Sequence, residues 1–170
     1  MSEQFKGYLK NGCGLIAAER SRQIHELDWD QDHDDAHSNG ELIDAGASYA
    51  MASMHQERGE PLDSVRSMET AGRLPWPWES SLWNPSVHIE RNLVKAGALI
   101  SAEIDRRYRA FQRDCNEITV LRYGFKCFDE MDAYDLYRED WIGISPYEFV
   151  RQHFADMTRI NREEDSDDES

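Results

Sequence analysis

The chain has 170 residues, which is enough for one principal domain with a hydrophobic core and too few for two large domains. Its 34 acidic and 19 basic residues give a formal net charge of -15 at pH 7. An acidic surface repels phosphate backbones and anionic membranes, so the composition argues against direct binding of nucleic acid or of a membrane.

The three cysteines form no CxxC pair and no metal-type spacing, which indicates reduced thiols. No apolar run approaches the roughly 20 residues of a membrane span, and residues 1–6 lack the basic and then apolar plan of a signal peptide. These features predict a cytoplasmic protein.

Two helices are predicted in the first third of the chain. Apolar residues at helical spacing predict a first helix over residues 14–27. The stretch 28–37 is dense in aspartate, which favours turns and caps, and predicts an acidic loop with two histidines. Ser38 or Asn39 can cap a second helix, which ends near residue 57.

A long crossover follows the second helix. Glycines and prolines in residues 58–86 exclude a continuous helix and predict an extended crossover with a short helical turn at 62–68. Trp76, Trp78 and Trp83 lie within eight residues, and their apolar area is too large to leave in water. The favoured interpretation is that they cover the core, and the alternative is that they dock a partner.

The clearest helical periodicity lies at residues 87–113, where Gly97 would allow another helix to approach closely. Residues 118–121 are partly β-branched and could form a short strand. Residues 129–141 have a helical pattern, and a Ser-Pro pair begins a last predicted helix at 145–160.

The predicted fold is therefore mainly α: a helical bundle with a long Pro/Trp-rich crossover and room for one short strand pair in the C-terminal third. We predict a helical core domain at residues 1–113 and a C-terminal helical extension, packed on that core, at 114–160. The acidic tail at 161–170 has no apolar residue and is predicted to be disordered.

Histidines and acids concentrate between the first two helices. Glu41 and Asp44 are three apart on a predicted helix and share a face, next to the loop imidazoles and carboxylates. Divalent metals accept these side chains as ligands. The predicted metal ligands are His33, Asp34, Asp35 and His37. The alternative interpretation is that these residues only cap the positive end of a helix.

The carboxylates also carry a resemblance. Glu19, then a spacer, then Glu41-x-x-Asp44 resembles the EExxE…ExxD pattern of all-helical MazG-type nucleotide pyrophosphohydrolases. The resemblance implies that these three residues are catalytic and that Mg²⁺ or Mn²⁺, with Zn²⁺ as a further candidate, activates the attacking water. Arg20 and Gln23 stand where that family places metal-binding acids.

Two basic residues complete the predicted hydrolase site. Arg91 and Lys95 are four apart on the long helix, so they share a face. We predict that both contact the phosphates of a small-molecule substrate. A solvated helix face is the alternative interpretation for Arg91.

A longer series of motifs resembles a widespread group of small phage and prophage proteins, over residues 15–109. The motifs are ERxRQ from residue 19, HDDxHxxGEL from residue 33, WPW from residue 76 and NLVKAGALIxAEI from residue 92. The resemblance implies a phage-associated accessory protein that acts in the host cell cytoplasm, often beside nucleotide-metabolism and replication functions.

Two functional hypotheses follow. The first is a metal-dependent hydrolase of nucleotides or related phosphorylated small molecules, with a homo-oligomer as one possible state. The second is an acidic phage inhibitor that mimics nucleic acid and binds a basic groove of a host defence or nucleic-acid-processing protein. The net charge of -15 and the acids of residues 129–140 motivate the second hypothesis.

Overall fold

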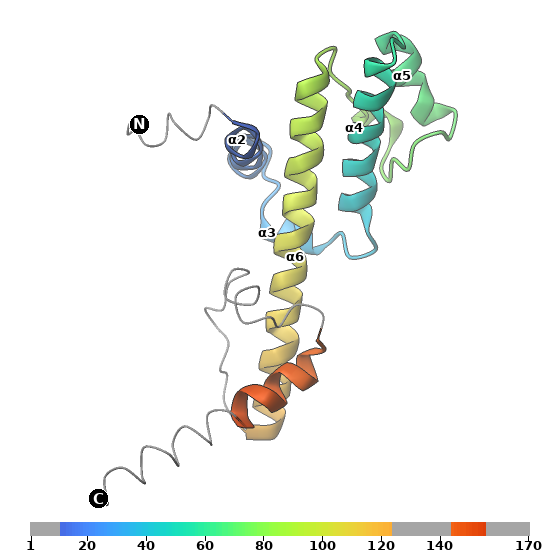
Figure 1. The fold of residues 1–170 in the computed structure, drawn as a ribbon. Helices are drawn as coiled ribbons and strands as arrows, with labels where there is room; N and C mark the ends of the chain where they lie inside the picture. Colours follow the sequence, from blue (N-terminus) through green and yellow to red (C-terminus); the bar gives the residue numbers. More distant parts are fainter. Residues whose placement is uncertain (1–10, 124–143, 156–170) are drawn as a thin grey trace, which may run out of the picture. The chain divides into compact units, whose positions relative to one another are not determined.

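The computed structural model describes residues 11–123 and 144–155 (Figure 1). The chain divides into two compact units, Met1–Arg106 and Arg107–Ser170. The described residues are mainly helical and contain no strand, which confirms the predicted mainly α class. No helix among these described residues is long and apolar enough to cross a bilayer.

The first described helix is α2, Gly12–Glu26. It begins two residues before the predicted start because the side chain of Asn11 caps it, accepting a hydrogen bond from the backbone N–H of Gly14 at 2.9 Å. The prediction of this helix is confirmed.

The aspartate-rich stretch is not a loop throughout, and that prediction is wrong over α3, Gln31–Asp35. The side chain of Asp30 accepts from the backbone N–H of His33 at 3.0 Å and so caps the helix. Asp32 and Asp34 lie in the first turn, where negative charge is favourable. The same aspartates that suggested a loop therefore begin a short helix.

The next helix, α4, Glu41–Glu57, confirms the predicted second helix but not its predicted cap. Its N-cap is Gly40, whose φ of 95° is left-handed and suits glycine. The Glu41 carboxylate instead accepts from the backbone N–H of Asn39 at 2.8 Å. Neither Ser38 nor Asn39 is the N-cap, because these two residues form a turn and Gly40 follows them before the helix begins.

The crossover contains one short helix, α5, Leu62–Thr70, and the 3₁₀ turn η1, Ser80–Leu82. The predicted helical turn is therefore confirmed. Buried Asn92 anchors the end of the crossover: its amide donates to Gln56 Oε1 at 2.7 Å and its oxygen accepts from the backbone N–H of Ser86 at 2.7 Å.

The long helix α6, Ile89–Tyr123, extends ten residues beyond its predicted end. The strand predicted at residues 118–121 is wrong, because those residues belong to this helix. Cys115 and Thr119 are fully buried, and their spacing of four places both on one helix face. Burial at helical spacing therefore outweighs the β-branched character of the segment.

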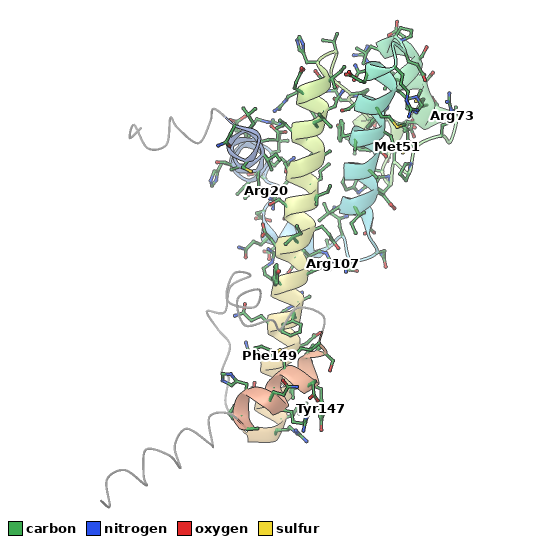
Figure 2. All side chains as sticks on the ribbon, viewed as in Figure 1. Arg20, Met51, Arg73, Arg107, Tyr147 and Phe149 are labelled. Carbon is green, nitrogen blue, oxygen red and sulfur yellow. The ribbon has the colours of Figure 1, made fainter. Side chains whose placement is uncertain are left out.

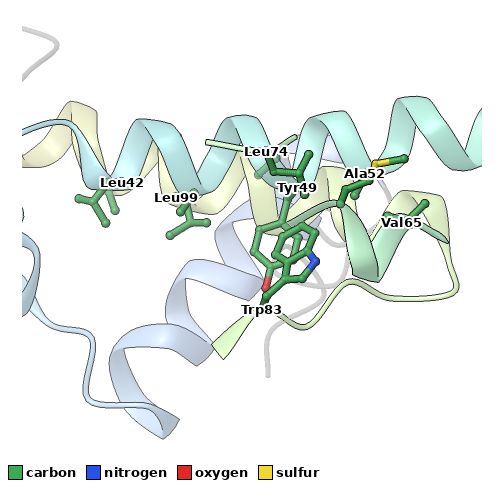
Figure 3. Packing of buried hydrophobic residues seen from close by; sticks show 11 residues of the cluster. Leu42, Tyr49, Ala52, Val65, Leu74, Trp83 and Leu99 are labelled. Carbon is green, nitrogen blue, oxygen red and sulfur yellow. The ribbon is translucent and has the colours of Figure 1, made fainter. Parts of the chain in front are cut away.

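Unit 1 has an apolar core built on α4, α5, the crossover and α6 (Figure 3). Small residues let the helices approach closely. A Cβ on Gly97 would lie 2.5 Å from Cδ1 of Ile16 on α2, and one on Gly46 of α4 would lie 3.3 Å from the carbonyl oxygen of Ala96 on α6. The predicted close approach of another helix at Gly97 is therefore confirmed.

Unit 2 contains the end of α6 and the helical residues 146–155. Phe149 packs on Phe111 with ring centroids 5.4 Å apart, beside buried Cys115 (Figure 2). The hydroxyl of Ser145 accepts from the backbone N–H of Glu148 at 3.2 Å, as expected of an N-cap. The last predicted helix is thus confirmed up to residue 155.

The predicted helix at residues 129–141 and the predicted acidic tail at 161–170 lie outside the described residues. The predicted division after residue 113 and the observed one after Arg106 both fall within α6.

Candidate ligand-binding cavity

A cavity of about 510 Å³ lies within unit 1. Its walls come from α2, from α3 and the residues that flank it, from α4, from the crossover and from α6. A volume of this size is typical of sites that hold a small ligand.

Histidines and tryptophans line one end of the cavity. Trp29 stacks on His33 with ring centroids 5.6 Å apart, His33 meets His37 at 4.8 Å, and His37 meets Trp78 at 5.2 Å. We call these four residues the histidine end. Burial is the main cause that lowers the pKa of His37, and the charge of His33 lowers it further, so the imidazole of His37 is mostly neutral at pH 7.

The row of rings continues from the histidine end toward α4. Trp76 meets Trp78 with centroids 5.2 Å apart and Tyr49 with centroids 5.7 Å apart. Behind them, buried Trp83 packs 5.0 Å from both Tyr49 and Trp76. Trp83 therefore belongs to the core, and half-buried Trp76 and Trp78 pack against that core, as predicted, while they also line the cavity.

The other end of the cavity is charged. Glu19 on α2 accepts hydrogen bonds from Nε and one terminal nitrogen of Arg22, both at 2.9 Å, and pairs with Arg91 of α6 at 2.6 Å. Burial alone would raise the pKa of Glu19, but the bonds from the two arginines outweigh it and the pKa is lowered. Glu19 is therefore a carboxylate at pH 7, held between two guanidinium groups.

Lys95 joins this charged group from α6. Its amine donates to the carbonyl oxygen of Asn84 at 2.7 Å and lies 4.9 Å from the ring centroid of Tyr49. Burial, and then the nearby positive charge of Arg91, lower the pKa of Lys95. We call Glu19, Arg22 and Lys95, together with Arg91, which pairs with Glu19 from outside this cavity, the cationic end.

The predicted phosphate-contacting pair is split between two cavities. Lys95 lines the 510 Å³ cavity, whereas Arg91 lines a second, more open cavity of about 440 Å³ on the other side of Glu19. Glu19 and Arg22 line both cavities and form the wall between them.

Asp34 does not face the cavity and instead joins α3 to α2. Its carboxylate, 1% exposed, pairs with the guanidinium of Arg20. Arg20 also donates to the carbonyl oxygen of Trp29 at 3.1 Å. This contact holds the turn that carries the histidine end.

The remaining predicted acids do not line the cavity, although the charge of Glu41 acts on His37, which does. Glu41 accepts from both nitrogens of Asn39, and Asp44 is exposed on α4. Asp35 is half-buried, and its negative charge helps to raise the pKa of Arg106, after the larger effect of a bonded glutamate. Of the predicted site residues, the cavity brings together Glu19, His33, His37 and Lys95.

Within residues 11–123 and 144–155, no three His, Cys, Asp or Glu side chains are grouped as metal ligands. Both oxygens of Glu19 already accept from guanidinium groups, and Asp34 is engaged by Arg20. These side chains, as arranged, do not fit the predicted Mg²⁺, Mn²⁺ or Zn²⁺ site, and dependence on a metal stays a prediction.

Sequence reasoning missed Arg22, Gln23 and Tyr49 as cavity residues. The spacing of Glu19 and Gln23 places both on one face of α2 and could have indicated that Gln23 belongs to the site. The resemblance to MazG-type enzymes instead suggested that this face carries metal ligands. Nothing in the sequence joins Arg22 to Tyr49, which come together only through packing of α2 and α4 around the cavity.

Comparisons with family models, with curated proteins and with solved structures gave no significant match. The resemblances to phage proteins and to MazG-type enzymes therefore stay predictions. So does the inhibitor hypothesis, since the acidic residues 129–140 lie outside the described part of the chain.

Proposed function

We propose that the protein binds a small ligand with a flat ring and a negatively charged group, in the class of nucleotides and related phosphorylated small molecules. One observation carries this proposal: a single cavity has aromatic rings along one side and the side chains of Arg22 and Lys95 at one end. Aromatic side chains stack on nucleobases, and guanidinium and ammonium groups bind phosphate.

The charge of the whole chain supports a small ligand rather than a polymer. A net charge of -15 repels an extended phosphate backbone, whereas a single small anion can enter a locally positive cavity. The cationic end is therefore locally positive within an acidic protein. Its positive charges can attract a small anion into the cavity.

Hydrolysis of the bound ligand, the activity that the sequence predicts, would draw on the same side chains. Arg22 and Lys95 can stabilise negative charge that develops on a phosphate, whereas the neutral imidazole of His37 lies at the other end of the cavity and can accept a proton only there.

Calorimetric titration with the common nucleosides and their mono- and triphosphates tests the proposal. We expect at least one nucleotide to bind, and Trp78→Leu to weaken its binding about five- to 150-fold, since stacking on one aromatic residue is worth about 1–3 kcal/mol. Arg66→Met is the control, because Arg66 is an exposed cation on α5 outside the cavity. Absence of binding by every compound would contradict the proposal.

A further inference from the structure

The charges at the cationic end can be counted. Arg22, Arg91 and Lys95 lie around one carboxylate, Glu19, although Arg91 lines the second cavity and the charge of Glu26 also acts on Arg22. The charges act on one another, because both arginines lower the pKa of Lys95 after the larger effect of burial. The positive excess is therefore small, and a phosphate monoester, with about -1.5 to -2 charges at pH 7, suits it better than a more highly charged polyphosphate.

The cavity has a direction. Arg22 of α2 and Lys95 of α6 supply the cationic side chains of its lining, and Leu99, one turn beyond Lys95 on α6, is uncharged. The row of rings runs alongside, from Tyr49 under Lys95 to Trp78 and His37. A ligand that fits both ends therefore carries its charge at one end and its flat ring at the other.

We infer that the cavity takes a nucleoside monophosphate, with its phosphate against Arg22 and Lys95 and its base against Trp78 and His37. This inference rests on the proposed function and narrows it. Besides the two histidines, Arg22 and Lys95 are the basic side chains among the described residues that line the cavity. The further charges of a triphosphate would therefore find no additional cation of the cavity wall, and Glu19 would repel them.

The monophosphate is held by side chains, without a bridging metal ion. Both oxygens of Glu19, which the sequence assigned to metal chemistry, accept hydrogen bonds from guanidinium nitrogens at 2.6 to 2.9 Å. Glu19 thereby fixes Arg22 at the cavity wall and is a positioning residue for the phosphate.

Titration of the full chain in EDTA tests the inference, with the four common nucleoside monophosphates, their triphosphates and the parent nucleosides as ligands. We expect the best monophosphate to bind at least tenfold more tightly than its triphosphate and its nucleoside. Lys95→Met should weaken the monophosphate about ten- to a hundredfold, the usual range for a charged hydrogen bond, and should leave nucleoside affinity nearly unchanged.

Two further variants separate charge from packing. Lys95→Arg keeps the charge and should retain most of the affinity, whereas Trp78→Leu should weaken the monophosphate and its nucleoside by the same factor. Arg66→Met removes an exposed cation outside the cavity and should change neither affinity. Thermal melting of each variant shows whether a loss of binding reflects a loss of folded protein.

The outcomes of these titrations distinguish a failure of this inference from a failure of the proposed function. A triphosphate that binds as tightly as its monophosphate in EDTA, or a Lys95→Met variant with unchanged monophosphate affinity, overturns the inference and leaves the proposed function standing. If no nucleotide and no nucleoside binds, both are overturned.

Discussion

Glu19→Gln removes the charge on which the two arginines of the cationic end converge. One carboxylate oxygen accepts from Arg22 at 2.9 Å and pairs with Arg91 at 2.6 Å, and the other accepts from Arg22 at 2.9 Å. A glutamine in the same place offers one neutral acceptor oxygen, and its NH₂ group must face at least one guanidinium donor. The variant therefore loses at least one of the three contacts and weakens the others.

The size of the effect follows from burial. The Glu19 side chain is 2% exposed, whereas those of Arg22 and Arg91 are 33% and 39% exposed, so water replaces part of what the arginines lose. A hydrogen bond to a charged group contributes about 1.5–3 kcal/mol. Because water replaces part of the lost contacts, we expect Glu19→Gln to lower the free energy of unfolding by about 2–3 kcal/mol in total. For a chain of 170 residues this lowers Tm by about 5–10 °C.

The pH dependence gives the sharper test. Because the pKa of Glu19 is lowered from its ordinary value of 4.5 on folding, its contribution is present above that value and is lost as pH falls through the lower, folded value. Thermal melts of both proteins should therefore show a gap in Tm at pH 7 that narrows below about pH 4. Equal Tm values at pH 7, or a gap that does not narrow in acid, would refute this reasoning.

The matched control is Asp63→Asn, which makes the same chemical change in an exposed pair. Asp63 lies 3.6 Å from Arg66 on α5, with its side chain 95% exposed. Exposed pairs of this kind contribute little to stability, so we expect little or no change in Tm.

Three further predictions concern packing and burial. Gly97→Ala should be neutral or destabilising by up to about 2 kcal/mol in denaturant melts, because the new methyl group meets Ile16. In an Ile16→Ala background, which makes room for the methyl group, the same change should be stabilising. If Gly97→Ala changes the free energy of unfolding in the same direction in both backgrounds, the described packing is contradicted. Burial raises the pKa of Cys115 to about 12, so iodoacetamide at pH 8 should modify exposed Cys13 and leave Cys115 untouched in the folded protein, as read by peptide mass spectrometry. Trp83→Phe should cost clearly less than the roughly 3–5 kcal/mol expected of Trp83→Ala, because the indole N–H of Trp83 has no hydrogen-bond partner among the residues that the structure describes; equal losses in denaturant melts would contradict this expectation.

The sequence predicted helices best where burial repeats along one face. The apolar positions of α4 and α6 recur at helical spacing and include buried core residues, so the starts of these helices were found to within a few residues. The start of α2 was found equally well, although its buried residues are Gly14, Glu19, Arg20 and Gln23 and apolar Leu15 is exposed. The sequence wrongly predicted a loop where α3 lies and a strand at residues 118–121, and the two errors have different physical origins. Aspartates can begin a helix as well as a loop, and β-branched residues become helical when a buried face requires it.

The site was predicted in part. The sequence predicted that His33 and His37 lie in one site, and the structure places their rings 4.8 Å apart, next to Trp29 and Trp78. The pairing of Glu19 with Arg91 joins α2 to α6 across a long stretch of chain, and no local pattern reports such a contact. The sequence thus indicates which side chains can bind or react. It does not show which of them contact one another, because those contacts depend on how the helices pack.

Fluorine NMR of protein labelled with 5-fluorotryptophan tests most directly whether the two-ended cavity holds a ligand. The chain has five tryptophans, and the signals of Trp76, Trp78 and Trp83 can be assigned by replacing each with phenylalanine. When the tightest-binding nucleoside monophosphate is added in EDTA, we predict that the Trp76 and Trp78 signals move to saturation and that Trp83, buried behind them, moves less. Trp76 and Trp78 signals that stay in place while calorimetry records binding would contradict a ligand in this cavity.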